Sequence, residues 1–277
     1  MRQRQKTKVK RFTITQRVLH LLLMVFFLIL GSTGLARLYF QTSWGKEIAS
    51  FYGGYERSFQ IHKFVGILII CCFLLHVLYL LFKILRKNGR RSLFGPDFLL
   101  PHPRDFKEFF QHVAWFFHVS SPPSFGRWSY WEKFDYWAVF WGIPILGITG
   151  LLLAYPIAAS RFIPGWGLNV ALWIHRIEAI LAMALVFIIH FFIAHLRPHK
   201  FLMDLAIFEG SVELEEARRE RSDWVKSLEK TGKLDFLLTP ETSSRLRAFY
   251  YLFGYIAMAL GIYLVIGALA NSKSVIW

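Results

Sequence analysis

Five histidines lie within or at the edge of the long apolar stretches of this 277-residue chain. They are His20, His62, His76, His175 and His190. An imidazole is costly to place in an apolar medium, so each of these side chains requires a polar partner. Imidazole nitrogens ligate metals, transfer protons near neutral pH and hydrogen-bond other groups, which makes the five histidines the candidates for chemistry.

The spacing of these histidines sorts them into two levels. Fourteen residues separate His62 from His76, and fifteen separate His175 from His190. In a helix each interval corresponds to about 21 to 22 Å, and its two members project within about 60° of the same face. If both segments cross a membrane in the same direction, His62 and His175 share an outer level. His76 and His190 then share an inner level, together with His20.

Pairs of imidazoles at matched depth are the arrangement that ligates two haem irons stacked across a membrane. Bis-histidine ligation leaves no open position for oxygen and therefore suits electron transfer. We expect an outer haem on His62 and His175. At the inner level His190 has two candidate partners, His20 and His76, and spacing alone favours His76. The alternative role for each histidine is an interhelical hydrogen bond or the lining of a polar cavity.

Five apolar stretches are long enough to position these histidines in a membrane. About 20 helical residues cross about 30 Å of hydrocarbon, and backbone groups in lipid must be hydrogen-bonded internally. We therefore expect an all-α integral membrane bundle of five transmembrane helices, of which the first four form the dihaem core. The predicted helices are roughly 14–38, 60–83, 134–157, 171–196 and 248–270.

Basic residues alternate between the two sides of this predicted bundle. Seven Lys or Arg lie in the first 17 residues, eight lie in loop 84–133 and ten lie in loop 197–247. The loops over 39–59 and 158–170 carry only two and one. The positive-inside rule then places the N-terminus in the cytoplasm and the C-terminus in the periplasm of a bacterial inner membrane. Because this asymmetry accounts for most of the net charge of +15, we do not expect nucleic acid as a partner.

Two cytoplasmic segments carry further signals. Aromatic residues at helical spacing over 103–118 predict an amphipathic helix in contact with membrane lipid. Residues 211–230 predict a short solvated helix with Ser211 as its N-cap. No strict internal repeat is apparent. The expected domains are a dihaem cytochrome b membrane domain over 1–210, a cytoplasmic helix and linker over 211–247, and the fifth transmembrane helix with its tail over 248–277.

Several motifs in order resemble one family. They include "HKFVG" at the start of the second helix, "YWEKFDYWAVFWGIPILGITGLLL" in the third and "HRIEAILAMALVFIIHFFIAHLRPHKF" in the fourth. Over roughly 11–210 the chain resembles the cytochrome b subunits of respiratory formate dehydrogenases and nickel–iron hydrogenases. The nearest branch is paired with periplasmic iron–sulfur or multihaem c-type partners. The resemblance implies two b haems that carry electrons between a quinone, for which we expect menaquinone, and such a partner.

The resemblance also implies a ligand set. In that family the outer haem would be held by His62 and His175, and the inner haem by His20 and His190. The family therefore favours His20 where spacing favours His76, and we lean to His20, with His76 as the competing ligand. This sequence departs from the family pattern in two features of its histidines. His76 is an additional histidine, and the interval in the fourth helix is fifteen residues where the family has fourteen.

The third departure concerns the quinone. The family pattern before the third helix is Asn-x-Gly-Gln-Lys, whereas the matching run here is "SYWEK". Only Lys133 matches the family pattern. The candidate quinone contacts are Lys133, Ser129 and His76. Three arginines near helix ends, Arg17, Arg176 and Arg197, are candidates to pair with haem propionates or to snorkel to headgroups.

The expected function is that of an electron-transfer subunit in a quinone oxidoreductase complex, and whether the chain is itself an enzyme stays open. One alternative is a free-standing cytochrome b561-like electron carrier. An alternative of another class is a haem-free membrane scaffold or transporter with a histidine proton path. That class is disfavoured because it predicts acids or broken helices at the midplane, and only the third helix carries an internal proline, Pro144.

Overall fold

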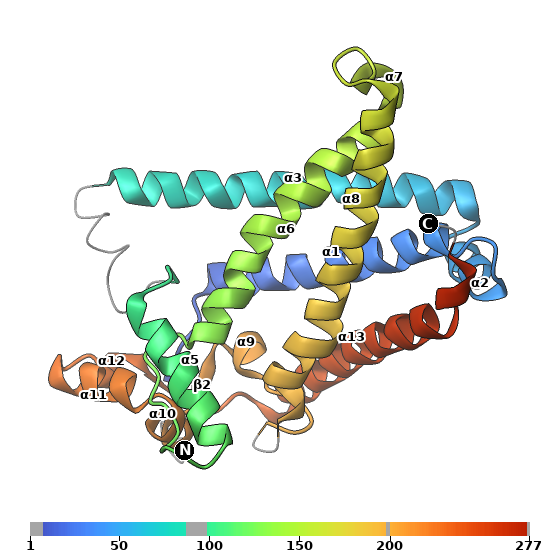
Figure 1. Ribbon diagram of the computed structural model, residues 1–277. Coiled ribbons are helices and arrows are strands. Elements are labelled where there is room, and N and C mark those ends of the chain that lie inside the picture. Colours follow the sequence, from blue (N-terminus) through green and yellow to red (C-terminus); the bar gives the residue numbers. More distant parts are fainter. Residues whose placement is uncertain (1–7, 87–98, 198–199, 276–277) are drawn as a thin grey trace. The chain divides into compact units, whose positions relative to one another are not determined.

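The structure is a computed structural model that describes residues 8–86, 99–197 and 200–275, and most of these residues are helical (Figure 1). Five of the described helices are long and apolar enough to cross a membrane. The predicted all-α membrane bundle with five such helices is therefore confirmed. Their observed bounds are α1 Ile14–Leu38, α3 Tyr55–Leu85, α6 Tyr130–Ala154, α8 with its continuation Gly165–Leu196, and α13 Ser244–Ala270.

The fourth of these helices changes its winding partway along. It is an α-helix over Gly165–Ala184 (α8) and a π-helix over Leu185–His190 (η1) and Phe192–Leu196 (η2). A π-helix is wider, so each residue turns the chain by about 85° instead of about 100°. Five such steps bring His190 to within about 20° of the direction of His175, where a pure α-helix would leave it about 60° away.

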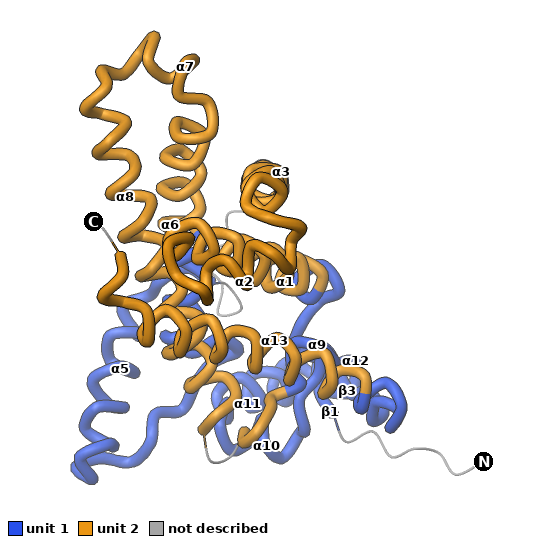
Figure 2. The backbone as a smooth tube through the Cα atoms, turned by 90° about the vertical axis from the view of Figure 1, so that its right-hand side faces the viewer, with its two compact units in different colours: residues 1–17, 77–139, 205–248 blue, residues 18–76, 140–204, 249–277 orange. Residues whose placement is uncertain are grey.

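The described chain falls into two compact units (Figure 2). One unit contains residues 18–76, 140–204 and 249–277, and thus most of the length of the five long helices. Its best-packed region joins α1, the short helix α2 (Ser43–Phe51), η1 and α13. Leu264 of α13 is almost fully buried there, and Tyr39 donates a hydrogen bond of 3.0 Å to the carbonyl oxygen of Ala268. The fifth helix is therefore packed into the same unit as the histidine-bearing helices.

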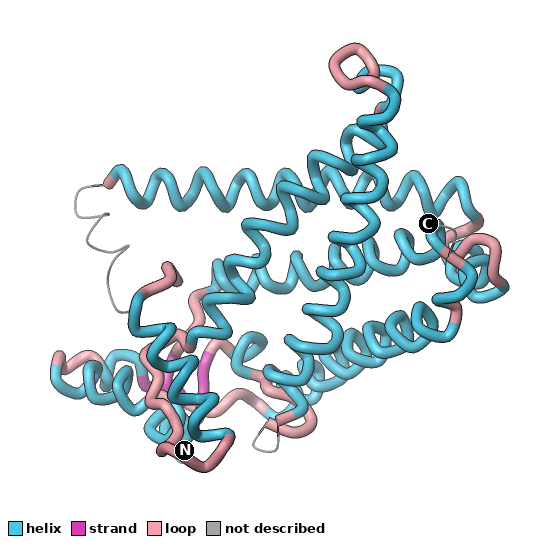
Figure 3. Tube along the Cα trace, in the orientation of Figure 1, coloured by secondary structure: helices cyan, strands magenta, loops and turns pink. Residues whose placement is uncertain are grey.

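The other unit contains residues 1–17, 77–139 and 205–248 and includes a small mixed domain. The N-terminal strand β1 (Lys8–Lys10) is the centre of a three-stranded antiparallel sheet, between β2 (Ser211–Glu213) and β3 (Leu238–Thr239) (Figure 3). Four short helices accompany the sheet: α9 Ala206–Glu209, α10 Leu214–Glu220, α11 Ser222–Lys230 and α12 Leu234–Leu237. The buried core is made of Val9, Ala206, Val212, Ala217, Trp224, Val225 and Leu228.

This domain corrects the prediction of one solvated helix over 211–230. Ser211 is not an N-cap, because it pairs with Lys10 in the sheet, and the helical part is divided into α10 and α11. The buried face of α11 includes Trp224. Local sequence could not show this outcome, since the partner strand lies about 200 residues earlier in the chain.

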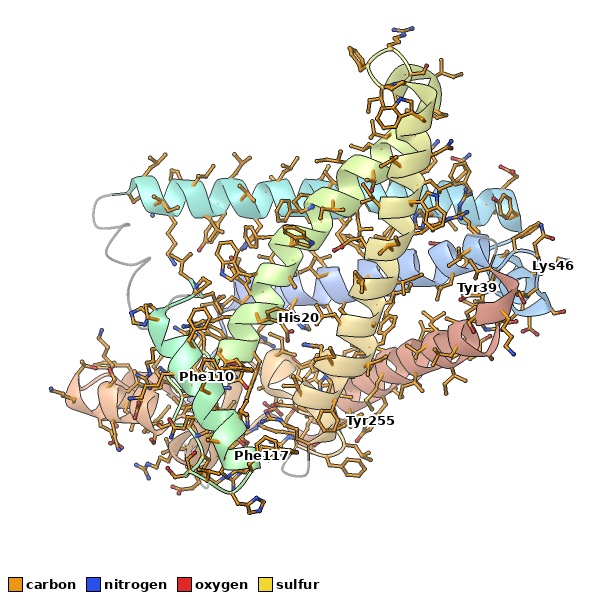
Figure 4. All side chains as sticks on the ribbon, in the orientation of Figure 1. His20, Tyr39, Lys46, Phe110, Phe117 and Tyr255 are labelled. Carbon is orange, nitrogen blue, oxygen red and sulfur yellow. The ribbon has the colours of Figure 1, made fainter. Side chains whose placement is uncertain are left out.

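The amphipathic helix expected over 103–118 is α5, Pro103–Phe116. It begins with a capping box, in which Asp105 accepts a hydrogen bond of 2.6 Å from the His102 backbone N–H. Phe110 and Phe117, labelled in Figure 4, are 65% and 68% exposed, which leaves aromatic side chains available to lipid. The membrane contact itself stays a prediction.

Candidate functional site

The outer pair of histidines forms a close contact between two helices. His62 lies on α3 and His175 on α8, and their ring centroids are 6.4 Å apart with the ring planes at 73°. When two imidazoles ligate one metal from opposite sides, each nitrogen lies about 2 Å from it, so the centroids are about 6.3 Å apart. The observed separation therefore matches that of two axial ligands of one iron.

A threonine on a neighbouring helix holds each ring of this pair. Thr33 Oγ1 on α1 lies 2.9 Å from Nδ1 of His62. Thr149 Oγ1 on α6 lies 3.0 Å from Nδ1 of His175. Both rings therefore have their Nδ1 atoms engaged in the same way, although the two threonines belong to different helices.

The direction of these hydrogen bonds follows from the other contact of each threonine. Thr33 Oγ1 lies 2.6 Å from the carbonyl oxygen of Ile29, and Thr149 Oγ1 lies 2.6 Å from that of Ile145. A hydroxyl has one proton, and here it is donated to the carbonyl, so the oxygen can only accept from the histidine. Both imidazoles are then protonated on Nδ1 and keep the lone pair on Nε2. A neutral imidazole in this tautomer is ready to ligate a metal.

Glycines allow the helices to approach these rings. A Cβ built on Gly34 would lie 3.3 Å from Cε1 of His62, and one built on Gly150 would lie 3.2 Å from Cε1 of His175. Each glycine directly follows a histidine-binding threonine, in the segments "GSTG" over 31–34 and "GITG" over 147–150. A short repeat is thus present where no strict internal repeat was expected, and it has the same structural role on α1 and α6.

At the inner level the ring of His190 faces that of His20, which is labelled on α1 in Figure 4. The centroids are 6.3 Å apart and the ring planes make an angle of 37°. The ring of His76, which spacing alone favours, packs against Phe140 with centroids 5.9 Å apart. The geometry therefore favours His20 as the partner of His190.

Another histidine, which sequence reasoning did not select, also contacts His190. The ring of His195 on η2 lies 6.3 Å from that of His190, at 89°. Its Nδ1 accepts a hydrogen bond of 3.2 Å from the Asp204 backbone N–H, so Nε2 of a neutral His195 carries the proton. The signal in the sequence is an interval of five residues, which places two side chains on one face only in a π-helix.

The candidate quinone contacts before α6 are engaged in local structure. Ser129 is fully buried, and its backbone N–H and hydroxyl donate to Glu132 at 2.9 Å and 2.8 Å. The backbone bond is the half of a capping box in which a glutamate of the first turn accepts from the residue before the helix. Lys133 Nζ lies 2.7 Å from a carboxylate oxygen of Asp105. His76 belongs to the other compact unit.

Two cations lie near the outer pair in the sequence of α1 and α3. Arg37 follows Thr33 by one helical turn, and its guanidinium carbon lies 4.0 Å from the centroid of Phe59. Lys63 follows His62 directly, and its Nζ lies 5.0 Å from the centroid of Tyr155. Of the three arginines that are candidates for propionates or headgroups, Arg17 and Arg197 donate to backbone carbonyls, of Phe208 and Ile193.

Among the described residues, no group of three or more His, Cys, Asp or Glu side chains could hold a metal ion. Haem iron needs only two ligands from the protein, because the macrocycle supplies the other four. Two imidazoles at axial separation are therefore an incomplete set for a bare ion and a complete set for haem.

Comparison with known protein families gives a match. The model of the family described as prokaryotic cytochrome b561 matches residues 11–207, about seven-tenths of the chain. The matched region includes all the histidines discussed above and ends before α13. No curated protein matches the chain.

Proposed function

The chain belongs to the prokaryotic cytochrome b561 family of haem b membrane electron carriers, and we propose that it binds two b haems, one at each histidine pair. His62 and His175 would hold the iron of the outer haem, and His20 and His190 would hold that of the inner haem. The observation that carries this proposal is the ring separation, 6.4 Å and 6.3 Å, at two levels of the fourth membrane helix, which pairs with α3 at one level and with α1 at the other. The Nδ1-protonated tautomer of both outer rings supports it further.

When bound, each haem supplies a reversible one-electron couple at an iron without an open coordination site. The chain supplies the orientation of the rings and an apolar surrounding. Along α8 and η1 the two levels are about 20 Å apart, so the pairs lie toward opposite sides of the apolar span. Electrons would thus cross most of the membrane between the two sites.

The carboxylates that the outer haem would bring need cationic partners. Arg37 and Lys63 are suited to this task, because each lies within one helical turn of a residue of the outer site and is held against an aromatic ring. Arginine binds carboxylates with two parallel hydrogen bonds, and lysine acts as a point charge.

The finer part of the proposal concerns the redox partners. We propose that the chain is the membrane subunit of a respiratory complex in the bacterial inner membrane, with its N-terminus in the cytoplasm. A quinone, for which we expect menaquinone, would react near the inner haem, with His76, Ser129 and Lys133 as candidate contacts. A periplasmic iron–sulfur or multihaem c-type protein would exchange electrons with the outer haem. The resemblance of the motifs and the asymmetry of basic residues support this arrangement.

The matching family also favours a second candidate function, that of a free-standing carrier without a fixed partner. Affinity purification of the chain from its native membrane separates the two. A redox subunit retained in stoichiometric amount supports the complex, and a haem protein that purifies alone supports the free carrier.

The proposed haem sites are tested by haem quantification and dithionite-reduced spectra of single variants. We expect two haems per chain in the unchanged protein and in His76→Ala. His62→Ala and His20→Ala should each retain one haem, because each removes one axial ligand. Loss of a haem in His76→Ala, with both haems kept in His20→Ala, would reverse the inner assignment. Absence of any reduced b-type band would overturn the function.

A further inference from the structure

Thr33 on α1 and Thr149 on α6 lie beside the two rings of the outer pair. Thr33 and Thr149 are 0% and 7% exposed, so neither reaches solvent or lipid. Each lies in the same four-residue pattern, and each hydroxyl donates its proton to the carbonyl oxygen four residues earlier in its helix. A lone pair of each hydroxyl oxygen can therefore accept a hydrogen bond from the Nδ1–H of His62 or His175.

We propose that Thr33 and Thr149 are positioning residues that fix the tautomer and ring orientation of His62 and His175 and thereby set the reduction potential of the outer haem. This inference rests on the proposed function, in which these two histidines ligate the iron. The physical reason is that a hydrogen-bond acceptor on the far nitrogen of a ligand imidazole raises the basicity of the ligating nitrogen. A more basic ligand stabilises the oxidised, more positive iron.

The nature of the acceptor decides the size of the effect. A hydroxyl oxygen is neutral, so it draws on the Nδ1–H less strongly than a carboxylate would. The ring therefore stays an imidazole with modest electron donation, and the outer haem keeps a higher potential than it would with a carboxylate in the same place. Because both ligands have the same acceptor, their contributions to the potential have the same sign.

Redox titration of Thr33→Val and Thr149→Val tests the inference, because valine keeps the shape and removes the acceptor. In each variant the equilibrium constant for reduction of the outer haem should rise about two- to fivefold, as expected for the loss of one modest hydrogen bond. At 59 mV per tenfold this is a rise of about 20 to 40 mV. The double variant should shift by the sum, and the inner haem should not change.

Two further variants make the result specific. Thr33→Ser restores a hydroxyl acceptor and should return the potential to its original value. Ser32→Ala is the matched control, because Ser32 is buried on the same helix and donates to a carbonyl four residues earlier, but its other partner is the Tyr52 hydroxyl at 2.6 Å. It should leave both potentials and the low-spin ferric EPR signals unchanged.

The outcomes separate this inference from the proposed function. Unchanged potentials and EPR signals in both valine variants, with two haems bound, would overturn the role of the threonines alone. Retention of both haems in His62→Ala would instead overturn the ligand assignment. If a valine variant loses the outer haem, serine at the same position decides, since a bound haem in Thr33→Ser or Thr149→Ser supports the hydrogen bond and continued loss shows that packing is the cause.

Discussion

At the scale of single residues, the outer site depends on what surrounds each histidine as much as on the histidines themselves. His62 and His175 each lie against a threonine hydroxyl, and a Cβ built on a nearby glycine would lie 3.2 to 3.3 Å from Cε1 of each ring. Because Cε1 lies between the two ring nitrogens, any atom that pushes it also moves Nε2. The ring centroids are 6.4 Å apart, which already matches the separation of two ligands of one iron, so such a shift would move Nε2 away from the iron position.

We predict that Gly34→Ala and Gly150→Ala each lower the occupancy of the outer haem. The added Cβ would lie 3.3 Å or 3.2 Å from Cε1 of the ligand ring, which is closer than nearly all real contacts of a Cβ. Haem content after purification measures the effect, and Gly165→Ala is the control, because a Cβ there meets open space. Full occupancy in both site variants would show that the ring can move without losing the iron.

At the scale of elements, the π-helical winding of η1 and η2 explains how the fourth helix holds its histidines. The interval of fifteen residues between His175 and His190 is one longer than in the resembling family. The wider turns absorb the extra residue and return His190 to the face of His175. The same winding brings His195 next to His190.

We predict an asymmetric response to changes of length in this segment. Deletion of Ile189 should be tolerated, because fourteen residues of regular α-helix rotate the second histidine by only about 40° from the first. Insertion of one alanine after Ile189 should abolish the inner haem, since one added π-helical residue turns His190 by about 85° away from its present direction. Quantification of haem in the two variants is the measurement. An inner haem kept after the insertion would contradict the assigned winding.

At the scale of the whole molecule, the chain contains more than a cofactor-binding bundle. The N-terminal strand, the start of α6 and the segment 205–248 form a compact unit of their own. Within it Glu132 contacts Arg11 at 2.5 Å and Arg221 at 3.0 Å, and both arginine side chains are less than 10% exposed. These ion pairs join three parts of the sequence that are far apart.

We predict that Glu132→Gln destabilises this unit by about 3 to 5 kcal/mol, because it leaves two buried guanidinium groups without their carboxylate. Limited proteolysis should then cut within 205–248 at an increased rate, while the reduced haem spectrum stays the same. Glu215→Gln is the matched control, since that side chain is 84% exposed and its pair with Arg218 is a surface one. Equal protease resistance of both variants would show that the buried pairs are dispensable.

The sequence by itself determined the five membrane helices and the two levels of histidines. It left open whether His20 or His76 is the inner partner of His190. Apolar length and the spacing of His62, His175 and His190 are local properties, so they can be read along the chain. Helix starts differ from the prediction by four to six residues in four of the five helices, because polar first turns such as Tyr130–Lys133 continue the helix beyond the apolar run.

Only the tertiary structure decided which ring faces which. The contact of His20 with His190, the hydrogen bonds of Thr33 and Thr149, and the strand formed by Lys8–Lys10 all join residues that are 26 or more positions apart. Such contacts depend on how helices and strands pack, and no local pattern specifies them. The rings of His62 and His175 are the clearest case, since the Nδ1 of each lies within hydrogen-bond distance of a threonine hydroxyl on another helix.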